Sequence, residues 1–154
     1  MTPEQLDAWM RLAIEQAEEA AADGEVPVGA IVVMDGKIMG RGRNRTEELD
    51  DPSAHAEIVA LRQAGQAMGD WRLEGATLVV TLEPCPMCIG AIIQARVSCL
   101  VYGAADHRYG ACGSALPLPP LELTPHLIEI RHETHAETGG RLLQDFFRRL
   151  RSKN

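Results

Sequence analysis

Residues 76–95 read ATLVVTLEPCPMCIGAIIQA, and this stretch decides the fold. Its first part, Ala76–Leu82, is an almost unbroken run of β-favouring apolar residues, which predicts a strand buried on both faces of a sheet. A short apolar helix, Ile89–Ala95, is predicted only a few residues later. The segment EPCPMC joins the two and places Cys85 and Cys88 at a helix start, where free N–H groups and the helix dipole favour thiolates.

A second polar motif lies upstream, in His55-Ala56-Glu57. The preceding DDPS at 50–53 is typical of a helix start, and residues 54–68 carry apolar side chains at helical spacing. His55 and Glu57 are therefore expected in the first turn of a helix. Positions two apart do not share a helix face, so one residue can hold a metal while the other points at whatever the metal activates.

Three of these side chains are candidate zinc ligands: the imidazole of His55 and the thiols of Cys85 and Cys88. Three protein ligands leave the fourth position of zinc open for water, which is the catalytic arrangement. Zinc lowers the pKa of that water to about 7, so hydroxide is available at neutral pH. Glu57 is the candidate proton shuttle, because a carboxylate beside the metal can take a proton and deliver it to a ring nitrogen and to leaving ammonia. H-x-E followed by P-C-x-x-C is typical of zinc-dependent nucleobase deaminases.

Other interpretations of the cysteine pair explain less. A closed structural zinc site needs a fourth ligand, for which His132-x-x-His135 is the obvious source, but that spacing falls short of the usual H-x3–5-H. A thioredoxin-like redox pair leaves the His-Ala-Glu motif unexplained. Of the two remaining cysteines, Cys99 lies in an apolar run that predicts burial, and Cys112 has no role assigned by its neighbours.

Length and composition predict one globular domain spanning residues 1–154. Apolar residues make up 45% of the chain and charged residues 24%, and no apolar run approaches the length of a membrane span. The first ten residues lack the pattern of a secretory signal, so a cytoplasmic protein without a membrane partner is expected. The net charge of −7 does not favour a general nucleic-acid binder, and no DNA partner is expected. Basic residues are nevertheless concentrated at 141–154, where they either attract phosphate or complement a helix C-terminus.

The rest of the chain alternates between helical and strand patterns. A helix is expected from Thr2 to the Asp23-Gly24 pair, and an Asp35-Gly36 hairpin is expected between two strands. The other predicted elements are strands at 28–34, 37–40, 99–103 and 127–131, a polar loop at 41–53, a long loop at 104–125 and a helix at 133–150. This alternation predicts a layered α/β sheet.

Three further positions have two interpretations each. Asn44 either hydrogen-bonds a substrate or holds a turn in its own loop. Glu83 either accepts backbone N–H bonds from the cysteine segment or orients a substrate amine. In the last helix, Leu142, Phe146 and Leu150 share a face, so one aromatic ring of the Phe146-Phe147 pair is buried and the other is free to stack on a base.

Longer stretches extend the pattern beyond the two motifs. They are VPVGA at 26–30, Asn44-Arg45, DPSAHAEI at 51–58, LVVTLEPCPMC at 78–88, residues 91–113 and DFFRRL at 145–150. Over almost its whole length, the chain resembles the bacterial tRNA-specific adenosine deaminases, which are members of the cytidine-deaminase-like superfamily.

This resemblance implies a three-layer α/β/α fold around a mixed sheet of about five strands. It also implies that adenosine is hydrolysed to inosine at the wobble position of a tRNA anticodon, by a homodimer with one Zn²⁺ per subunit. By similarity, the metal ligands are His55, Cys85 and Cys88, and the proton shuttle is Glu57. The residues expected at the substrate are Asn44, Val26, Val28, Glu83, Asp106 and Arg108, and those expected at the anticodon loop are Phe147, Arg148 and Arg149.

The chain also departs from the family pattern. The loop Asp106-His107-Arg108-Tyr109-Gly110 carries Arg where the family usually has Lys, which keeps the charge but changes its geometry. The stretch Leu116–Pro120 is unusual and has no assigned role. The alternative prediction is a guanine deaminase, or a deaminase of a related free base or nucleoside, on the same scaffold.

Overall fold

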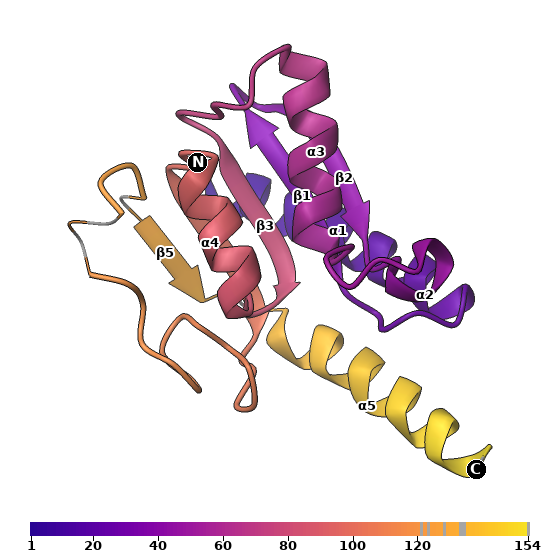
Figure 1. The fold of residues 1–154 in the computed structure, drawn as a ribbon. Coiled ribbons are helices and arrows are strands. Elements are labelled where there is room, and N and C mark those ends of the chain that lie inside the picture. Colours follow the sequence, from indigo (N-terminus) through magenta and orange to yellow (C-terminus); the bar gives the residue numbers. More distant parts are fainter. Residues whose placement is uncertain (121, 123, 128, 133–134, 154) are drawn as a thin grey trace.

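Five strands form one mixed sheet in the order β2-β1-β3-β4-β5 (Figure 1). The strand β1 (Gly29–Met34) pairs antiparallel with both β2 (Lys37–Arg43) and β3 (Thr77–Leu82). The strands β4 (Cys99–Ala104) and β5 (Glu129–His132) continue the sheet in parallel with β3. The computed structural model describes residues 1–120, 122, 124–127, 129–132 and 135–153.

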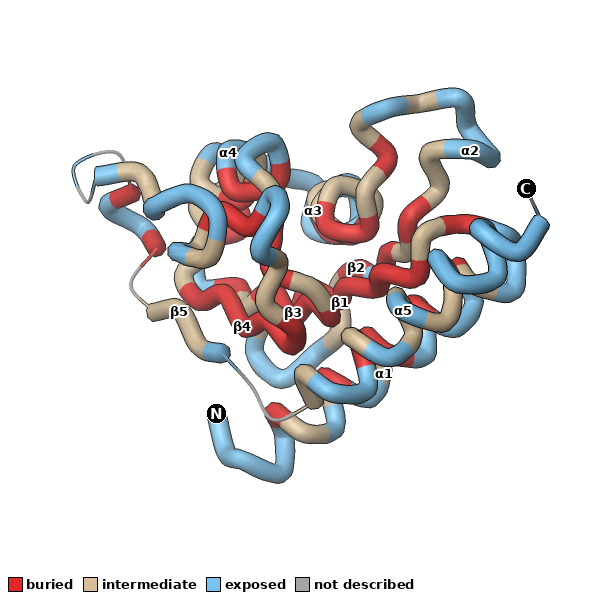
Figure 2. Tube along the Cα trace, turned by 90° about the horizontal axis from the view of Figure 1, so that it is seen from below, coloured by how far each residue is buried: buried red, intermediate tan, exposed pale blue. Residues whose placement is uncertain are grey.

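Helices cover both faces of this sheet (Figure 2). On one face lie α1 (Pro3–Ala22) and α5 (Ala136–Ser152), and on the other lie α3 (Ala56–Met68) and α4 (Pro86–Gln94). A fifth, short helix, α2 (Thr46–Leu49), lies beyond the end of β2. The three layers and the mixed five-stranded sheet confirm the predicted fold class. Within the described part of the chain, no helix is both long enough and apolar enough to cross a membrane.

The core is divided into two layers by the alternation of side chains along each strand. In β1, Ala30 and Val32 face the layer that contains α3 and α4, whereas Ile31 and Val33 face the layer that contains α1. All four are at most 3% exposed. A strand with apolar residues on both faces is therefore buried on both faces, as the continuous apolar pattern of β3 also predicts.

The predicted boundaries hold for most elements. Thr2 caps α1 and forms a reciprocal capping box with Gln5, and Asp35-Gly36 forms the hairpin turn with positive φ at both positions. The helix α2 lies within the segment expected to be a loop, and β2 continues to Arg43 rather than ending near residue 40. The expected start of the last helix at 133 lies outside the described residues.

The helix α3 lies unusually close to β2 because two glycines of the strand carry no side chain. A Cβ at Gly42 would lie 2.1 Å from the carbonyl oxygen of Ala56, and one at Gly40 would lie 2.2 Å from that of Ala60. Larger residues at either position would displace α3. The close packing therefore fixes the start of α3, which carries the His-Ala-Glu motif.

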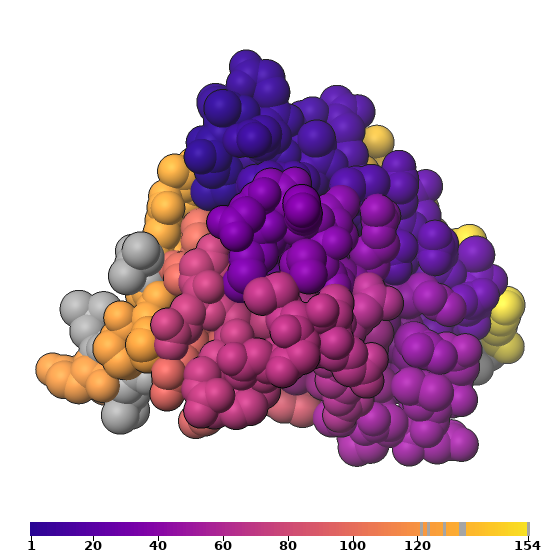
Figure 3. All heavy atoms as spheres, turned by 90° about the horizontal axis from the view of Figure 1, so that it is seen from above, coloured from indigo at the N-terminus to yellow at the C-terminus, as the bar shows by residue number. Residues whose placement is uncertain are grey.

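The two ends of the strands differ in how they are covered. The starts of α3 and α4 meet at the end of the sheet where β3 finishes, close to α2 and the start of β1 (Figure 1). The opposite end of the sheet, seen in Figure 3, is covered by N-terminal residues, the β1–β2 hairpin and the segment that follows α3. The polar motifs of the sequence lie together at the first of these ends.

Candidate active site

A cavity of about 410 Å³ lies at the end of the sheet where β3 finishes. Its lining combines apolar walls with a few polar side chains, which is the usual composition of a small-molecule site. The lining residues are Val26, Val28, Asn44, Thr46, His55, Ala56, Glu57, Leu82, Glu83, Cys85, Asp106 and Tyr109. The loop before β1, the loop after β2, the start of α3 and the ends of β3 and β4 all contribute to it.

Three potential metal ligands converge at the base of this cavity. The Nδ1 atom of His55 lies 3.6 Å from the Sγ of Cys85 and 3.5 Å from the Sγ of Cys88. A tetrahedral zinc ion with ordinary Zn–S and Zn–N bonds would place nitrogen and sulfur about 3.6 Å apart. In the part of the chain that the structure describes, this is the one group of three His, Cys, Asp or Glu side chains close enough to share a metal. The donor set and its spacing therefore fit zinc.

Two helix starts hold these ligands in place. Cys85 is the N-cap residue of α4, with Cys88 in the first turn of that helix. His55 is the N-cap residue of α3 and has an extended backbone, so the expectation that it lies inside the first helical turn is wrong. The N-cap position turns the His55 side chain toward the cysteines, while Glu57 lies within the helix proper.

The two thiols differ in acidity. The hydrogen bond from Cys88, supported by His55, lowers the pKa of Cys85 to about 4 against the opposing effect of burial. The same contact with Cys85, together with burial, raises the pKa of Cys88. The hydrogen bond to Cys85 also raises the pKa of His55. Such strong mutual effects are expected where donor atoms are packed closely enough to share one cation.

Glu57 faces the same cavity and is only 4% exposed. Burial raises the pKa of its carboxyl group, and this effect outweighs the attraction of the neighbouring His55. A carboxyl group with a raised pKa holds a proton more readily than an ordinary carboxylate, which suits a general acid–base residue.

Asn44 also lines the cavity, beside the apolar side chains of Val26 and Val28. Its backbone N–H donates to the carbonyl of Val28, at 3.2 Å, which ties the end of β2 to the segment before β1. Its side-chain Nδ2 approaches Thr46 and Glu25 at 3.3 and 3.5 Å. The interpretation that Asn44 holds a turn in its own loop describes the Nδ2 group, which contacts Thr46. The interpretation that Asn44 contacts a substrate stays a prediction, and the position of Asn44 on the cavity wall fits it.

Glu83 lines the cavity too, but its carboxylate binds a loop. Its oxygens accept hydrogen bonds from the backbone N–H groups of Asp106, Cys112 and Ser114 at 3.2, 2.9 and 3.2 Å, and from the Ser114 hydroxyl. Burial opposes ionisation, yet these bonds outweigh burial and lower the pKa of Glu83. Glu83 thus accepts backbone N–H bonds, as one interpretation expected, although from residues 106–114 rather than from the cysteine segment.

The predicted substrate and RNA residues fall into two neighbouring places. Asp106 lines the cavity, whereas Arg108 lines a separate cleft of about 530 Å³ against α5. Phe147 and Arg148 share that cleft with Arg108, and Arg149 does not line it. Phe147 is 41% exposed and Phe146 is partly buried, as expected for one free and one packed ring.

Three residues of the site were not singled out by sequence reasoning. Thr46 and Tyr109 line the cavity, and Ser114 binds the Glu83 carboxylate. Tyr109 lies within the Asp-His-Arg-Tyr-Gly segment, which had been singled out by its resemblance to the family, so the sequence could have indicated this residue. Nothing in the local sequence marks Ser114, because its partner Glu83 is distant in the chain, and Thr46 lies in a segment that was expected to be a loop.

Comparison with known proteins shows the family to which this chain belongs. A family model described as MafB19-like deaminase matches residues 4–151. The tRNA-specific adenosine deaminase of Bacillus subtilis (strain 168) is 44% identical over 153 residues, which cover 99% of this chain and 94% of that protein. The chain belongs to the tRNA-specific adenosine deaminase family. The enzyme of the same name from Haemophilus influenzae is 43% identical over 148 residues, covering 96% and 86% of the two chains.

Solved structures agree with this membership. A structure from studies of A-to-I editing by tRNA:A34 deaminases at the wobble position superposes with a TM-score of 0.79 at 39% identity, covering 89% of this chain and 99% of that chain. A guanine deaminase from Nitrosomonas europaea superposes with a TM-score of 0.77 at 27% identity, covering 94% and 84%. The predicted family and the cytidine-deaminase-like fold are confirmed, and the protein is an enzyme, a deaminase.

Proposed function

We propose that this deaminase converts adenosine to inosine at the wobble position of a tRNA anticodon, as a single catalytic domain spanning residues 1–154. One observation carries the proposal: a buried carboxyl group with a raised pKa, Glu57, shares a cavity with a His/Cys/Cys group of zinc-like spacing. The relatives at 43–44% identity are named tRNA-specific adenosine deaminases, which supports the choice of substrate.

In this proposal His55, Cys85 and Cys88 hold one Zn²⁺ per subunit. Two thiolates neutralise the charge of the ion, and a neutral imidazole completes a three-ligand set that suits zinc. When bound, zinc supplies acidified water as a nucleophile at neutral pH.

Glu57 moves the protons of the reaction. Its carboxylate takes a proton from the attacking water and delivers it to the ring nitrogen N1 of adenine as the new C6–O bond forms. Glu57 then takes the proton of the new hydroxyl on C6 and delivers it to the C6 amine, so the C6–N bond breaks, the C6 carbonyl forms and ammonia leaves. Adenosine and water are thereby converted to inosine and ammonia, and Glu57 ends in its starting state.

The cavity walls hold the target nucleoside. The apolar side chains of Val26 and Val28 would contact the base, and Asn44 and Asp106 would supply hydrogen bonds that orient it. Glu83 would act on the substrate through the 106–114 loop that it binds. A base enclosed in this way must leave the stack of the anticodon loop.

The cleft beside the cavity is the proposed RNA contact. Arg108 and Arg148 are positioned to neutralise phosphates, with Arg149 beside them on α5, and exposed Phe147 can stack on an unpaired base. The partner is then a tRNA anticodon loop rather than DNA, and the enzyme works in the cytoplasm as a homodimer. These features would serve little purpose for a free-base substrate.

The alternative is a guanine deaminase, which the likeness to the Nitrosomonas europaea enzyme favours. The two are separated by incubating the protein with an arginine-tRNA anticodon stem-loop bearing adenosine at the wobble position, and in parallel with free guanine. Inosine in the RNA and no ammonia from guanine is the expected result. Ammonia from guanine without inosine in the RNA would contradict the proposal.

A further inference from the structure

One buried carboxylate beside the cavity has no part in the mechanism above. Glu25 precedes the cavity residue Val26 and is only 2% exposed. Burying a carboxylate is costly unless hydrogen bonds replace its hydration. The donors that surround Glu25 therefore indicate what this residue does.

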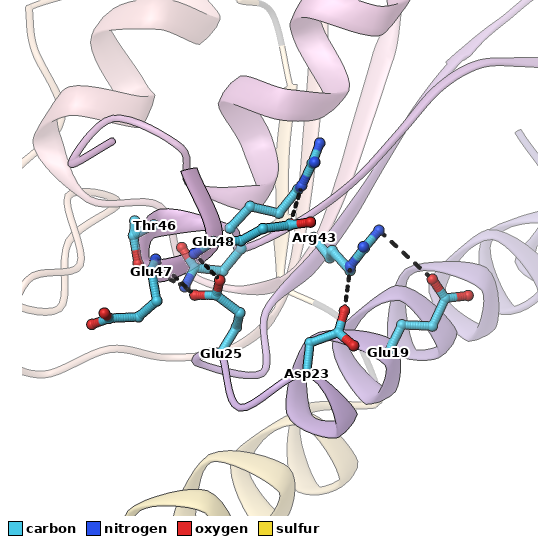
Figure 4. Close-up of polar contacts among 9 residues, drawn as sticks. Glu19, Asp23, Glu25, Arg43, Thr46, Glu47 and Glu48 are labelled. Carbon is cyan, nitrogen blue, oxygen red and sulfur yellow. Dashed lines mark hydrogen bonds and ion pairs between the residues drawn. The ribbon is translucent and has the colours of Figure 1, made fainter. Parts of the chain in front are cut away.

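Two of these donors are backbone N–H groups in the first turn of α2 (Figure 4). Glu25 accepts from the N–H of Glu47 at 3.1 Å and from that of Glu48 at 2.8 Å. The N-cap residue of α2, Arg45, makes no side-chain capping hydrogen bond. Glu25 thus supplies the cap from a distant part of the chain and fixes this short helix at the rim of the cavity.

The third donor is the side chain of Asn44. Its Nδ2 lies 3.5 Å from Oε1 of Glu25 and 3.3 Å from Oγ1 of Thr46, so both of its hydrogens are engaged by these two residues. Among the described residues, no hydrogen-bond donor to Oδ1 of Asn44 is found. In the same residues, every buried side-chain oxygen or nitrogen has a hydrogen-bond partner. Oδ1 is therefore not fully buried, and it belongs to a side chain that lines the open cavity.

The carboxylate also determines which way the amide is turned. An ionised carboxylate accepts hydrogen bonds and donates none, so the reversed amide would place two acceptors against each other. We propose that Glu25 is a positioning residue for the target nucleoside: it holds Asn44 with Oδ1 toward the cavity, where this oxygen accepts a hydrogen bond from an N–H or O–H group of the nucleoside. The inference rests on the proposed function for the identity of that nucleoside.

The test is a double-mutant cycle of Glu25→Gln and Asn44→Ala on deamination of the anticodon stem-loop. Glutamine keeps the size of Glu25 but places an NH₂ group against the donors of Asn44 or α2. Losing a hydrogen bond to a charged group predicts a fall in kcat of about ten- to a hundredfold. We expect KM to change less than about threefold, since phosphate contacts dominate RNA affinity. In the Asn44→Ala background, Glu25→Gln should cost less than about threefold.

Two controls separate positioning from a general loss of structure. Asp23→Asn removes a nearby carboxylate that pairs with Arg43 at the surface, at 3.3 Å, and should leave kcat within about twofold (Figure 4). Zinc content and Tm are measured for every variant, so that only folded, metal-loaded protein enters the cycle. Additive losses from Glu25→Gln and Asn44→Ala would overturn the inference.

A second measurement does not depend on activity. The side-chain NH₂ resonances of Asn44, assigned by their loss in Asn44→Ala, report hydrogen exchange of the amide. We expect slow exchange in the wild-type protein and exchange at least about tenfold faster in Glu25→Gln. Unchanged exchange would overturn the inference, whereas protected exchange in a protein that forms no inosine would leave the Asn44 geometry standing and contradict the proposed function instead.

Discussion

Two buried glutamates line the same cavity and have opposite properties. Glu57, on the side of the metal ligands, is 4% exposed and has a raised pKa, because burial is not offset by enough hydrogen bonds. Glu83, on the side of the 106–114 loop, is 2% exposed and has a lowered pKa, because donors from three residues surround it. Burial alone therefore does not make a carboxylate reactive; the number of donors committed to it decides whether it exchanges protons or holds structure.

The metal side is where the largest loss is expected. Cys88→Ala removes one of the three ligands, and the remaining pair should not retain zinc. Activity should fall by at least about 10⁴-fold, because the nucleophile is lost. Metal analysis and an inosine assay measure the two effects. A chelator should inactivate the wild-type enzyme and added Zn²⁺ should restore it; full activity in zinc-depleted protein would remove the metal from the mechanism.

Glu57→Ala tests the reactive carboxylate without removing a ligand. We expect zinc to be retained at one ion per subunit and turnover to fall by about 10³-fold, within the range for losing a general acid–base group. Glu57→Gln, which keeps the size and loses the proton transfer, should be equally inactive and no less stable than the wild-type protein. Turnover close to the wild-type value in either variant would disprove the proton-shuttle role.

Glu83→Gln tests the structural carboxylate. The four donors of residues 106–114 lose a charged acceptor, so the free energy of unfolding should fall by about 2 kcal/mol. We expect kcat/KM for the stem-loop to fall by about tenfold, since Asp106 and Tyr109 lose their anchor, while zinc content stays constant. Urea unfolding and steady-state kinetics provide the two values. A loss as large as that of Glu57→Ala with unchanged stability would erase the distinction between the two glutamates.

The smallest effect is expected outside the cavity, where α1 and α5 are joined by Asp7 and His135, 2.5 Å apart. Hydrogen bonds from Arg11 and His135 lower the pKa of Asp7. A carboxyl group whose pKa is lowered on folding stabilises the protein above its unfolded pKa of about 3.9, and that contribution disappears as the pH falls through the folded pKa.

Asp7→Asn should therefore lower Tm by a few degrees at most at pH 7, and by less near pH 3. Thermal unfolding of the two proteins at both pH values measures this difference. Deamination of the stem-loop should remain within about twofold of wild type, because neither glutamate of the cavity is touched. A larger loss of activity would show that the α1–α5 contact controls the RNA cleft.

Much of the site followed from local sequence. His55, Glu57, Cys85 and Cys88 lie in two short motifs, and each motif coincides with a helix start that flanking residues predict. Chain neighbours determine helix caps and strand patterns, so they can be inferred one segment at a time. Among these four residues, the local prediction was wrong only for His55, which caps α3 instead of lying within it.

The surroundings of the cavity could not be derived in this way. Asn44 had two interpretations that local sequence could not separate, and the segment containing α2 was expected to be a loop. Arg108 and Asp106 stood side by side as substrate residues, yet they line different hollows. The contacts of Asn44 and α2 with Glu25, and the cleft that Arg108 shares with α5, join residues about twenty or more positions apart.

Two short motifs and the order of the predicted elements were enough to predict an α/β sheet that carries a candidate three-ligand metal set with a carboxylate beside it. Only the tertiary structure decided what three of its buried glutamates do. Glu25 and Glu83 accept hydrogen bonds from backbone groups of distant parts of the chain, and Glu57 faces the cavity with its pKa raised by burial. Every glutamate carries the same carboxylate, whereas the number of hydrogen-bond donors around it depends on contacts between residues distant in the chain.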